Sequence, residues 1–407
     1  MPSPYETWRR LLRHEPLPAA VVDLDAVARN AAVLGQQLRL GAAGRSPAPT
    51  LRIATKSVRS PGLLRRLLDL DPAFQGLLCT TAAEARALAE QGFDDLFVAY
   101  PAARRDEVRT LAELTARGLR VVATVDCVEH IDLLDAAGRE LGVVLRLAID
   151  LDMSLRPAGG RLGHLGVRRS PVRDVAAARS LAAHAAGAPG VQLVGLLGYE
   201  AQVAGIADEN PTSRGLDPVR ALIKERSRAA VRALRGAVGQ ALRQDGHHLD
   251  LVNGGGTGSL AFTAGDPSVT EVAAGSGFLC PHLFDHYRDL DLEPAAFFVL
   301  AVVRRSDPAH LTCFGGGYIA SGPAGPDRVP RVYLPEGLSP LGFEGWGEVQ
   351  TPFRDRSRER LELGDPVLCR HAKAGELAER FAELVLVQDG AIVERVPTWR
   401  GLGLAFG

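Results

Sequence analysis

From residue 51 to residue 280, short apolar runs alternate with segments whose apolar residues recur at helical spacing. The runs are LRIATK (51–56), GLLCTT (76–81), DLFVAYP (95–101), LRVVATVD (119–126), VVLRLAID (143–150), VQLVGLLGY (191–199), LDLVNGG (249–255) and EVAAGSG (271–277). Continuous apolar strands separated by amphipathic helices are typical of a parallel sheet that is covered on both faces. Eight such units predict a (β/α)8 barrel over residues 51–280, because that fold typically takes about 250 residues. A doubly wound open sheet is the alternative.

The two flanking segments follow other patterns. Residues 18–50 begin with the strand-like run PAAVVD and continue into a helical segment, for which Asp25 is the expected N-cap. Residues 281–407 contain short alternating runs broken by glycine and proline, which favours a mostly antiparallel C-terminal β domain. Because the barrel already has its eight strands, we expect the strand of residues 18–50 to join this β domain.

Composition and charge narrow the classes of partner. The chain has 407 residues and a formal net charge of −1, which provides no general attraction to nucleic acid or to an acidic membrane. No apolar run approaches the about 20 residues that cross a bilayer. The N-terminus lacks the apolar core of a signal peptide. The five cysteines are scattered without a CxxC pair, which predicts reduced thiols in a cytoplasmic protein rather than a disulfide or structural zinc framework.

Lys56 ends the first strand of the predicted barrel. The active sites of such barrels lie at the C-terminal strand ends, so the Lys56 amine is expected to point into that mouth. A partly desolvated lysine has a lowered pKa and can form a Schiff base with a carbonyl compound. A solvated lysine at a strand end is the simpler alternative.

Small-residue turns follow the seventh and eighth strands. Their candidate cofactor-binding residues are Asn253, Gly255, Gly256, Thr257, Ser276 and Gly277. Consecutive glycines let backbone N–H groups converge on an oxyanion, and barrels often hold phosphate at these two strands. An amine beside a phosphate site predicts a ligand with both an aldehyde and a phosphate, for which pyridoxal 5′-phosphate (PLP) is the economical candidate. The alternatives are tight turns without a ligand, or an aldolase that uses the lysine directly on a sugar phosphate.

These segments also resemble a known family. The chain is similar to the alanine racemase-like, fold-type III PLP enzymes, with the closest similarity to their D-threonine aldolase and D-serine dehydratase branch, as in bacterial proteins labelled amino acid deaminase/aldolase. The resemblance spans residues 18–407 and rests on the order and spacing of AVVDLDAVARN, ATKS, LVGLLGYEAQ, NGGGTGS, EVAAGS, GEVQTP, GDPVLCRHAKAGE and TWRGLG. It implies a barrel with a C-terminal β domain, and a head-to-tail homodimer in which each β domain completes the partner's active site.

The resemblance implies roles for individual residues. Lys56 would hold PLP as a Schiff base, and Tyr199 matches the tyrosine of a tyrosine-x-glycine-histidine element near the cofactor. The residues implied to bind the PLP phosphate are Gly255, Gly256, Thr257, Ser276 and Gly277. Glu348 and Gln350, in GEVQTP, would lie on the substrate side of the partner's active site.

The chain departs from the family pattern at residues that carry catalysis. The lyase branch holds a divalent metal, Mn or Zn, with a histidine and a cysteine or aspartate two residues later. Here His371 matches the histidine, but Lys373 follows it, and a protonated lysine cannot ligate a metal. We therefore favour a hydrogen-bonding role for His371 over a metal site. If a metal were bound at His371, Glu376 would be a candidate second ligand. Lys373 is expected to hold a substrate carboxylate or to carry a proton, and Gln202 replaces the histidine of the tyrosine element.

The fifth strand and the loop after it contain weaker candidates. Asp150, at the strand end, is expected to orient a substrate amine, with a turn carboxylate as the alternative. Arg146, within the strand, is expected on the cofactor side. His164 and Arg168, in the long loop of residues 155–171, are candidates for contacts with cofactor or substrate, with a solvated loop as the alternative.

The segment FLCPHLFDHY, which follows the eighth strand, places Cys280 two residues before His282. Nothing in the sequence supplies further metal ligands nearby. We therefore interpret these two residues as part of the hinge into the β domain.

The combined features predict a PLP-dependent enzyme that acts at Cα or Cβ of a small amino acid, expected to be of D configuration. A lyase of the D-threonine aldolase or D-serine dehydratase type is favoured, because the resemblance is to lyases. An amino-acid racemase or epimerase is the second choice, and a non-catalytic PLP-binding protein is the third. The predicted partners are the amino-acid substrate and a second copy of the chain, without nucleic acid or membrane.

Overall fold

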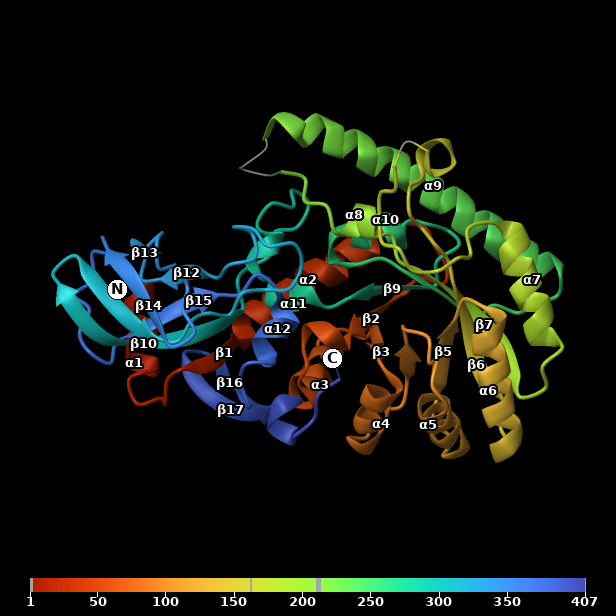
Figure 1. Ribbon diagram of the computed structural model, residues 1–407, viewed down its shortest axis with the longest axis horizontal. Helices are drawn as coiled ribbons and strands as arrows, with labels where there is room; N and C mark the ends of the chain where they lie inside the picture. The colour runs from red at the N-terminus through yellow and green to blue at the C-terminus, as the bar shows by residue number, and fades with distance from the viewer. Residues whose placement is uncertain (1–2, 162, 210–213, 407) are drawn as a thin grey trace.

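The computed structural model describes residues 3–161, 163–209 and 214–406. Eight parallel strands close into a barrel in the order β2 to β9, which forms the right-hand lobe of Figure 1. Closure is direct, because β2 pairs with β9 and places Leu51 beside Val272. The strands are β2 (Thr50–Ala54), β3 (Phe74–Cys79), β4 (Leu96–Val98), β5 (Val121–Val125), β6 (Leu145–Asp150), β7 (Val191–Gly198), β8 (Leu251–Gly254) and β9 (Glu271–Ala274). The predicted barrel is confirmed, and the open sheet is excluded.

Helices cover the outside of the barrel because each has one apolar face. In α3, Leu63, Leu64 and Leu67 are buried against the barrel, whereas Arg65 and Arg66 are exposed. The barrel helices are α3 (Pro61–Leu68), α4 (Ala82–Glu90), α5 (Arg105–Ala116), α6 (Val128–Leu141), α7 (Val175–Ala186), α8 (Ala201–Ala204), α9 (Asp217–Gln244), α10 (Leu260–Ala264) and α11 (Ser276–Leu279). The long α9 runs across the top of Figure 1. Within the described ranges, no helix is long and apolar enough to span a membrane.

Short 3₁₀ helices occur at several strand ends and loops. They are η1 (Thr55–Ser57), η2 (Pro157–Gly160), η3 (Arg214–Leu216), η4 (Thr257–Ser259), η5 (His282–Phe284) and η6 (Arg400–Leu402). Two of them matter for the site, since η1 directly follows β2 and η4 directly follows the glycine run after β8. The C-terminal ends of these strands therefore turn sharply at the mouth of the barrel.

A layer of charged side chains fills part of the barrel interior. The buried guanidinium of Arg52 forms two hydrogen bonds to the Glu271 carboxylate, at 2.8 and 2.9 Å, and one to Asp95 at 2.8 Å. Asn253 donates to the same Glu271 carboxylate at 2.8 Å. Because a buried charge is costly without partners, this pairing is what lets the layer exist inside the barrel. The layer ties β2, β8 and β9 together beneath the ends that carry the candidate site.

The second lobe, on the left of Figure 1, is a mostly antiparallel sheet. Its main path is β13-β14-β11-β10-β1-β16-β17, and β15 pairs with both β10 and β12. The strands are β1 (Ala19–Asp23), β10 (Ala296–Asp307), β11 (His310–Phe314), β12 (Arg331–Leu334), β13 (Leu338–Pro340), β14 (Gln350–Asp355), β15 (Pro366–Arg370), β16 (Glu383–Gln388) and β17 (Ala391–Pro397). The N-terminal strand β1 lies between β10, to which it is antiparallel, and β16, to which it is parallel.

Helices α2 and α12 contact both lobes, α2 through β16 and α10, and α12 through η1. The N-cap of α2 (Leu24–Gly41) is Asp23, whose carboxylate accepts a hydrogen bond from the N–H of Ala26 at 3.0 Å. The expectation that Asp25 is the cap is therefore wrong, because β1 ends earlier and the helix begins at Leu24. The other helices here are α1 (Pro4–Leu11), which the sequence pattern did not predict, and α12 (Ala374–Ala378). The latter packs on η1, beside Lys56.

Candidate active site

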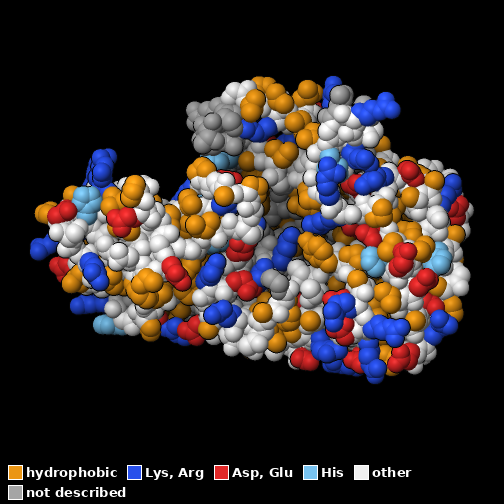
Figure 2. Space-filling view, viewed as in Figure 1, with side chains coloured by type: hydrophobic (Ala, Val, Ile, Leu, Met, Phe, Trp, Pro, Cys, Tyr) orange, Lys and Arg blue, Asp and Glu red, His pale blue; other side chains and the backbone are white. Residues whose placement is uncertain are grey.

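A cavity of about 870 Å³ lies at the C-terminal ends of the barrel strands. Residues after β2, β7, β8 and β9 line it from the barrel, and Arg328, Arg331 and Lys373 line it from the β domain. In the space-filling view the surface is hollowed between the two lobes (Figure 2). This volume is in the range of roughly 300–1,000 Å³ of pockets that hold small ligands. The cavity therefore lies where the barrel architecture places an active site.

Lys56 lies in η1 and its side chain is exposed to this cavity. The pKa of its amine is lowered, first because the recessed site desolvates the charged form, and then because Arg169, Lys373 and Arg59 are positively charged. A lowered pKa increases the fraction of neutral amine, which is the form that attacks a carbonyl. Lys56 is therefore an amine in a recess among positive charges, an environment that favours its neutral form.

The turn after β8 exposes a glycine run to the cavity. Gly255 has φ +85°, and a Cβ there would lie 2.7 Å from Val272 Cγ1, so both conformation and space favour glycine. Gly256, Thr257 and Ser276 also line the cavity. The N–H groups that start η4 and α11 have no partner within their own short helices. Together with the two hydroxyls, they form a concave polar surface suited to a phosphate.

Some of the expected phosphate donors are already engaged within the protein. The N–H of Gly255 donates to Glu200 at 3.0 Å, and that of Gly256 donates to Ser259 Oγ at 3.2 Å. The N–H of Gly277 donates to Thr257 Oγ1 at 3.1 Å, and the residues that line the cavity do not include Gly277. These bonds link the two turns to each other and to the protein beneath them. The polar groups that remain available to bind an anion therefore lie near Thr257 and Ser276.

A buried ion-pair network holds the glycine turn from behind. Glu200 and Arg235 are fully buried and their side chains meet at 2.9 Å, while Arg235 also pairs with Asp266 at 2.8 Å. The carboxylate of Glu200 also accepts hydrogen bonds from Ser259 and Thr263. The sequence analysis did not find this network, because its members come from separate segments. The only local signal was a charged residue, Glu200, directly after an apolar strand.

Arg169, Tyr100 and Tyr199 lie together at the mouth of the barrel. The Arg169 guanidinium lies over the rings of Tyr100 and Tyr199, at 5.1 and 5.2 Å from their centroids, and donates to the Tyr100 hydroxyl at 3.1 Å. Burial raises the pKa of Tyr199 and keeps its phenol protonated. All three residues line the cavity. They form an electropositive wall that can face an anionic group of a ligand.

Comparison with known proteins identifies the family. Residues 22–260 match the family model described as "Alanine racemase, N-terminal domain", which is more than half of the chain. The chain belongs to this family. The barrel of this structure runs from β2 (Thr50–Ala54) to β9 (Glu271–Ala274), and the cavity with Lys56 opens at the mouth of that barrel.

Individual relatives of this alanine racemase-family protein are lyases by name. It is 25% identical over 314 residues to a 3-hydroxy-D-aspartate aldolase of Paracoccus denitrificans (strain Pd 1222), covering 74% of this chain and 71% of the relative. It is 25% identical over 294 residues to a D-threonine aldolase of Arthrobacter sp, covering 71% and 69%.

Solved structures show the same fold along almost the whole chain. A D-threonine aldolase from Filomicrobium marinum has a TM-score of 0.77 and 22% identity, covering 96% of this chain and 97% of that one. D-threo-3-hydroxyaspartate dehydratase from Delftia sp. HT23 has a TM-score of 0.76 and 19% identity, covering 95% and 98%. At sequence identities of 22% and 19%, these similarities establish the fold alone.

His371 and Lys373 do not form the metal site considered from the family resemblance. His371 is buried, its Nδ1 lies 2.6 Å from the carbonyl oxygen and 3.0 Å from the backbone nitrogen of Lys373, and its ring also bonds to the backbone of Tyr318. The residues that line the cavity do not include His371. Lys373 does line it, and its amine lies 2.6 Å from Ser321 Oγ and 3.1 Å from Glu376. An ammonium with these partners and a histidine turned to the backbone do not fit a divalent metal.

Other predicted residues lie away from the cavity. Gln202 is buried and donates to the Met153 carbonyl at 2.5 Å, and Arg146 pairs with Asp250 at 2.5 Å near the start of β6, at the opposite end of the strand from the mouth. Glu348 and Gln350 are exposed on the β domain. None of these four lines the cavity of this chain. The cofactor-side position expected of Arg146 is therefore not observed, because its place in the strand directs it to Asp250.

Asp150 is buried at the end of β6 but is not among the cavity-lining residues. Burial raises its pKa to about 7, and the negative charges of Asp126 and Asp152 act in the same direction, against Arg169. In the adjacent loop, His164 bonds to the Val167 carbonyl at 3.3 Å, and neither it nor Arg168 lines the cavity. The neighbouring Arg169 does, so in this loop Arg169, and neither of the two predicted candidates, lies at the cavity.

His282 has a place in the site that the sequence analysis did not predict. It is buried, lines the cavity, and its Nε2 lies 2.9 Å from the Val329 carbonyl, while Nδ1 has no hydrogen-bond partner among the described residues. Burial and then Arg331 lower the pKa of His282 to about 4, so the ring is neutral at physiological pH. With Nε2 as the donor to Val329, Nδ1 is a hydrogen-bond acceptor.

The scarcity of lysine in the sequence is a further signal for the site. The chain contains only three lysines, Lys56, Lys224 and Lys373, and arginine supplies the positive charge elsewhere. Two of the three line the cavity, and the third is held by Asp208 at 2.6 Å. Arginine cannot lose its proton in a protein, so a lysine in such a chain indicates a place where a deprotonated amine or a compact cation is needed.

Proposed function

We propose that the protein is a PLP-dependent lyase that acts on small β-hydroxy D-amino acids. The observation that carries this proposal is the position of Lys56, whose amine opens on the same cavity as Thr257 and Ser276 in a member of the alanine racemase N-terminal domain family. The relatives named 3-hydroxy-D-aspartate aldolase and D-threonine aldolase support a lyase over a racemase.

The cavity residues have the chemistry needed to hold PLP. The neutral amine of Lys56 would bind the aldehyde covalently, and the turns that contain Gly256, Thr257 and Ser276 would receive the phosphate. Asn253 lines the floor of the cavity and is fixed by Glu271. When bound, the cofactor supplies an electron sink for the bond that breaks at Cα.

Positive side chains would orient the substrate. Arg169 and Lys373 both depress the pKa of Lys56, so their charges lie close to the reacting amine. Arg328 and Arg331 line the cavity from the β domain. A substrate with a carboxylate at Cα, and in hydroxyaspartate a second one at Cβ, would match this electropositive lining. We therefore expect an acidic β-hydroxy D-amino acid to be preferred over D-threonine.

Protons would be handled by residues of the cavity rather than by a metal. Lys56 can accept or return a proton at Cα once its amine is released. The ammonium of Lys373, fixed by Ser321 and Glu376, would stabilise negative charge that develops on the substrate.

The homodimer is part of the same proposal. Glu348 and Gln350 are exposed and lie outside the cavity of their own chain. This position is compatible with contact to a partner's cavity, where they would act on the substrate side. We also propose a cytoplasmic location, on the basis of the scattered cysteines, all five of which are free.

The test combines cofactor mapping with a substrate panel. The PLP-loaded protein is reduced with borohydride and digested, and we expect the label on Lys56 rather than on Lys224 or Lys373. The unreduced protein is then incubated with 3-hydroxy-D-aspartate, D-threonine, D-serine and D-alanine. Glycine from the first two, absent in Lys56→Ala, is the expected result. L-alanine from D-alanine would indicate a racemase, and no product from the panel would overturn the assignment as a lyase.

A further inference from the structure

A second group of reactive side chains lies at the turn between β5 and α6. Asp126 follows the last residue of β5, Cys127 is the N-cap of α6, and His130 is in its first turn. Each offers one ligand atom, and these three atoms lie within 4.8 Å of one another. Within the described ranges, this is the one group of His, Cys, Asp and Glu side chains with such a spacing.

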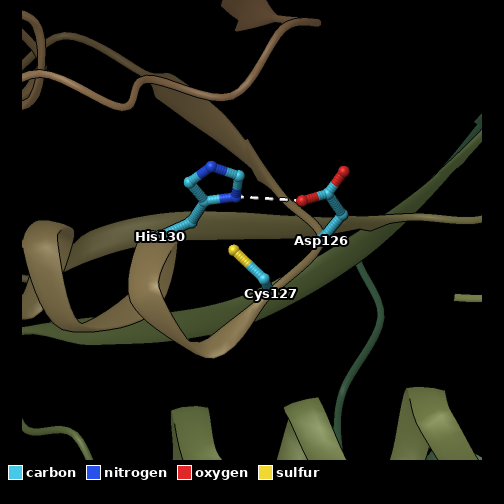
Figure 3. Close-up of side chains that lie close together, drawn as sticks. All are labelled: Asp126, Cys127 and His130. Carbon is cyan, nitrogen blue, oxygen red and sulfur yellow. Dashed lines mark ion pairs between the residues drawn. The ribbon is translucent and has the colours of Figure 1, made fainter. Parts of the chain in front are cut away.

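The three side chains converge on one point (Figure 3). The sulfur of Cys127 lies beneath the His130 ring in this view, and the Asp126 carboxylate faces the same ring from the other side. The Nδ1 atom of His130 lies 3.0 Å from Asp126 Oδ1. Two ligands of one tetrahedral zinc ion are about 3.4 Å apart, given zinc bonds of about 2.0–2.1 Å. If Nδ1 and Oδ1 moved apart by about 0.4 Å, they could therefore bind the same ion.

The His130 ring contains an unsatisfied polar atom at this point. Its Nδ1 is shielded from solvent and has no hydrogen-bond partner of acceptable geometry, although the Asp126 oxygen is close. A buried polar atom without a partner is costly, so such an atom calls for a cation or another electrophile. The side chains of His130 and Asp126 are 17% and 16% exposed, so the group lies close to the protein surface.

The ligand chemistry selects the class of metal. Thiolate and imidazole prefer zinc and similar transition metals, whereas magnesium and calcium prefer oxygen ligands alone. Three protein ligands leave one position of a tetrahedral ion for water. None of the three residues lines the large cavity, so this group is separate from the proposed PLP site.

We infer that Asp126, Cys127 and His130 form a binding site for a single zinc-class ion, which fastens the β5–α6 turn at the barrel mouth. The bound ion would join the end of a barrel strand to the first turn of its helix, and the water at the fourth position would face solvent. This inference does not depend on the proposed lyase activity.

The test uses the one partly exposed thiol. Cys127 is partly exposed, whereas the other four cysteines, Cys79, Cys280, Cys313 and Cys369, are buried. A thiol reagent applied to the native PLP-loaded protein should therefore react with Cys127 first. We expect one equivalent of Zn²⁺ to slow that reaction at least ~10-fold, as expected when a metal holds the thiolate. Co²⁺ should produce a thiolate-to-cobalt absorption band that saturates at one ion per chain.

The decisive variant is His130→Gln, which keeps the thiol but removes the imidazole. It should lose both the zinc protection and the cobalt band, and Cys127→Ser should also lose the band. The matched control is His184→Gln, because His184 pairs with Asp132 at 2.7 Å on the exposed surface without a cysteine. Equal protection in His130→Gln and in the unchanged protein would overturn the site, as would a cobalt band that Cys127→Ser does not alter.

Discussion

Gly375 lies directly against the backbone of Lys56. A Cβ at position 375 would be 1.7 Å from the Lys56 carbonyl oxygen, a separation that no packing adjustment of a side chain could relieve. Because Gly375 belongs to α12 of the β domain and Lys56 to the mouth of the barrel, this contact sets how closely the two lobes approach at the reactive amine. The absence of a side chain at position 375 therefore helps to place Lys56.

We expect Gly375→Ala to displace α12 or the end of β2 and so to disturb Lys56. The visible absorbance of covalently bound cofactor and the turnover rate should both fall at least ~10-fold, because a small misplacement of a reacting group is enough for such a loss. The control is Gly236→Ala in α9, where a Cβ meets open space and alanine is the better helix former. Cofactor content unchanged in Gly375→Ala would contradict the contact.

The pH dependence of cofactor attachment should report the charge of Arg169. The pKa of Lys56 is lowered by desolvation in the recessed cavity and then by the charge of Arg169, and only the neutral amine attaches the aldehyde. Arg169→Gln removes a positive charge and raises this pKa, so the midpoint of attachment should move to higher pH, by roughly half a unit to one unit. An absorbance titration measures it. Arg168→Gln, outside the cavity, should leave the midpoint in place, and equal midpoints in all three proteins would refute the effect.

The buried network behind the glycine turn should dominate stability. Arg235→Met leaves the carboxylates of Glu200 and Asp266 buried without their cation, so we expect a loss of about 3–5 kcal/mol in the free energy of unfolding, measured with urea. Arg179→Met breaks an exposed pair with Asp245 and should cost under about 1 kcal/mol. Similar losses in the two variants would show that the buried network is not a major contribution.

Turnover should not require a metal in the cavity. His371 is bound to backbone atoms and Lys373 is an ammonium, so dialysis against a chelator and addition of Mn²⁺ should both leave the rate unchanged. The zinc-class site proposed at Asp126 lies outside the cavity and its removal should not alter this result. A rate that rises severalfold with Mn²⁺ would be inconsistent with the structure.

Lys373 should contribute to catalysis through its charge. Lys373→Met is expected to lower the rate about 100-fold, as for the loss of one donor that stabilises developing negative charge. Lys373→Arg keeps the positive charge and should retain most of the rate with little change in cofactor absorbance. If Lys373→Met is as active as the unchanged enzyme, the residue has only a structural role.

The loop after β6 illustrates where sequence reasoning stops. Periodicity identifies buried faces in strands and helices, but it carries no information on side-chain direction in an irregular loop. Arg168 and Arg169 are adjacent and chemically identical, and only the second lines the cavity. His282 is similar: its place between the last barrel strand and the β domain follows from the order of elements, whereas its burial beside Val329 depends on a distant segment.

The amino-acid sequence by itself determined the barrel, the β domain and the strand-end positions of Lys56 and the glycine turns, because hydrophobic periodicity and strand order are local properties of the chain. Only the tertiary structure decided that Glu200 pairs with Arg235, that Gly375 rests on Lys56, and that His371 turns away from the cavity. These relationships join segments far apart in the chain, and their geometry depends on how complete elements pack. No spacing along the sequence encodes that packing.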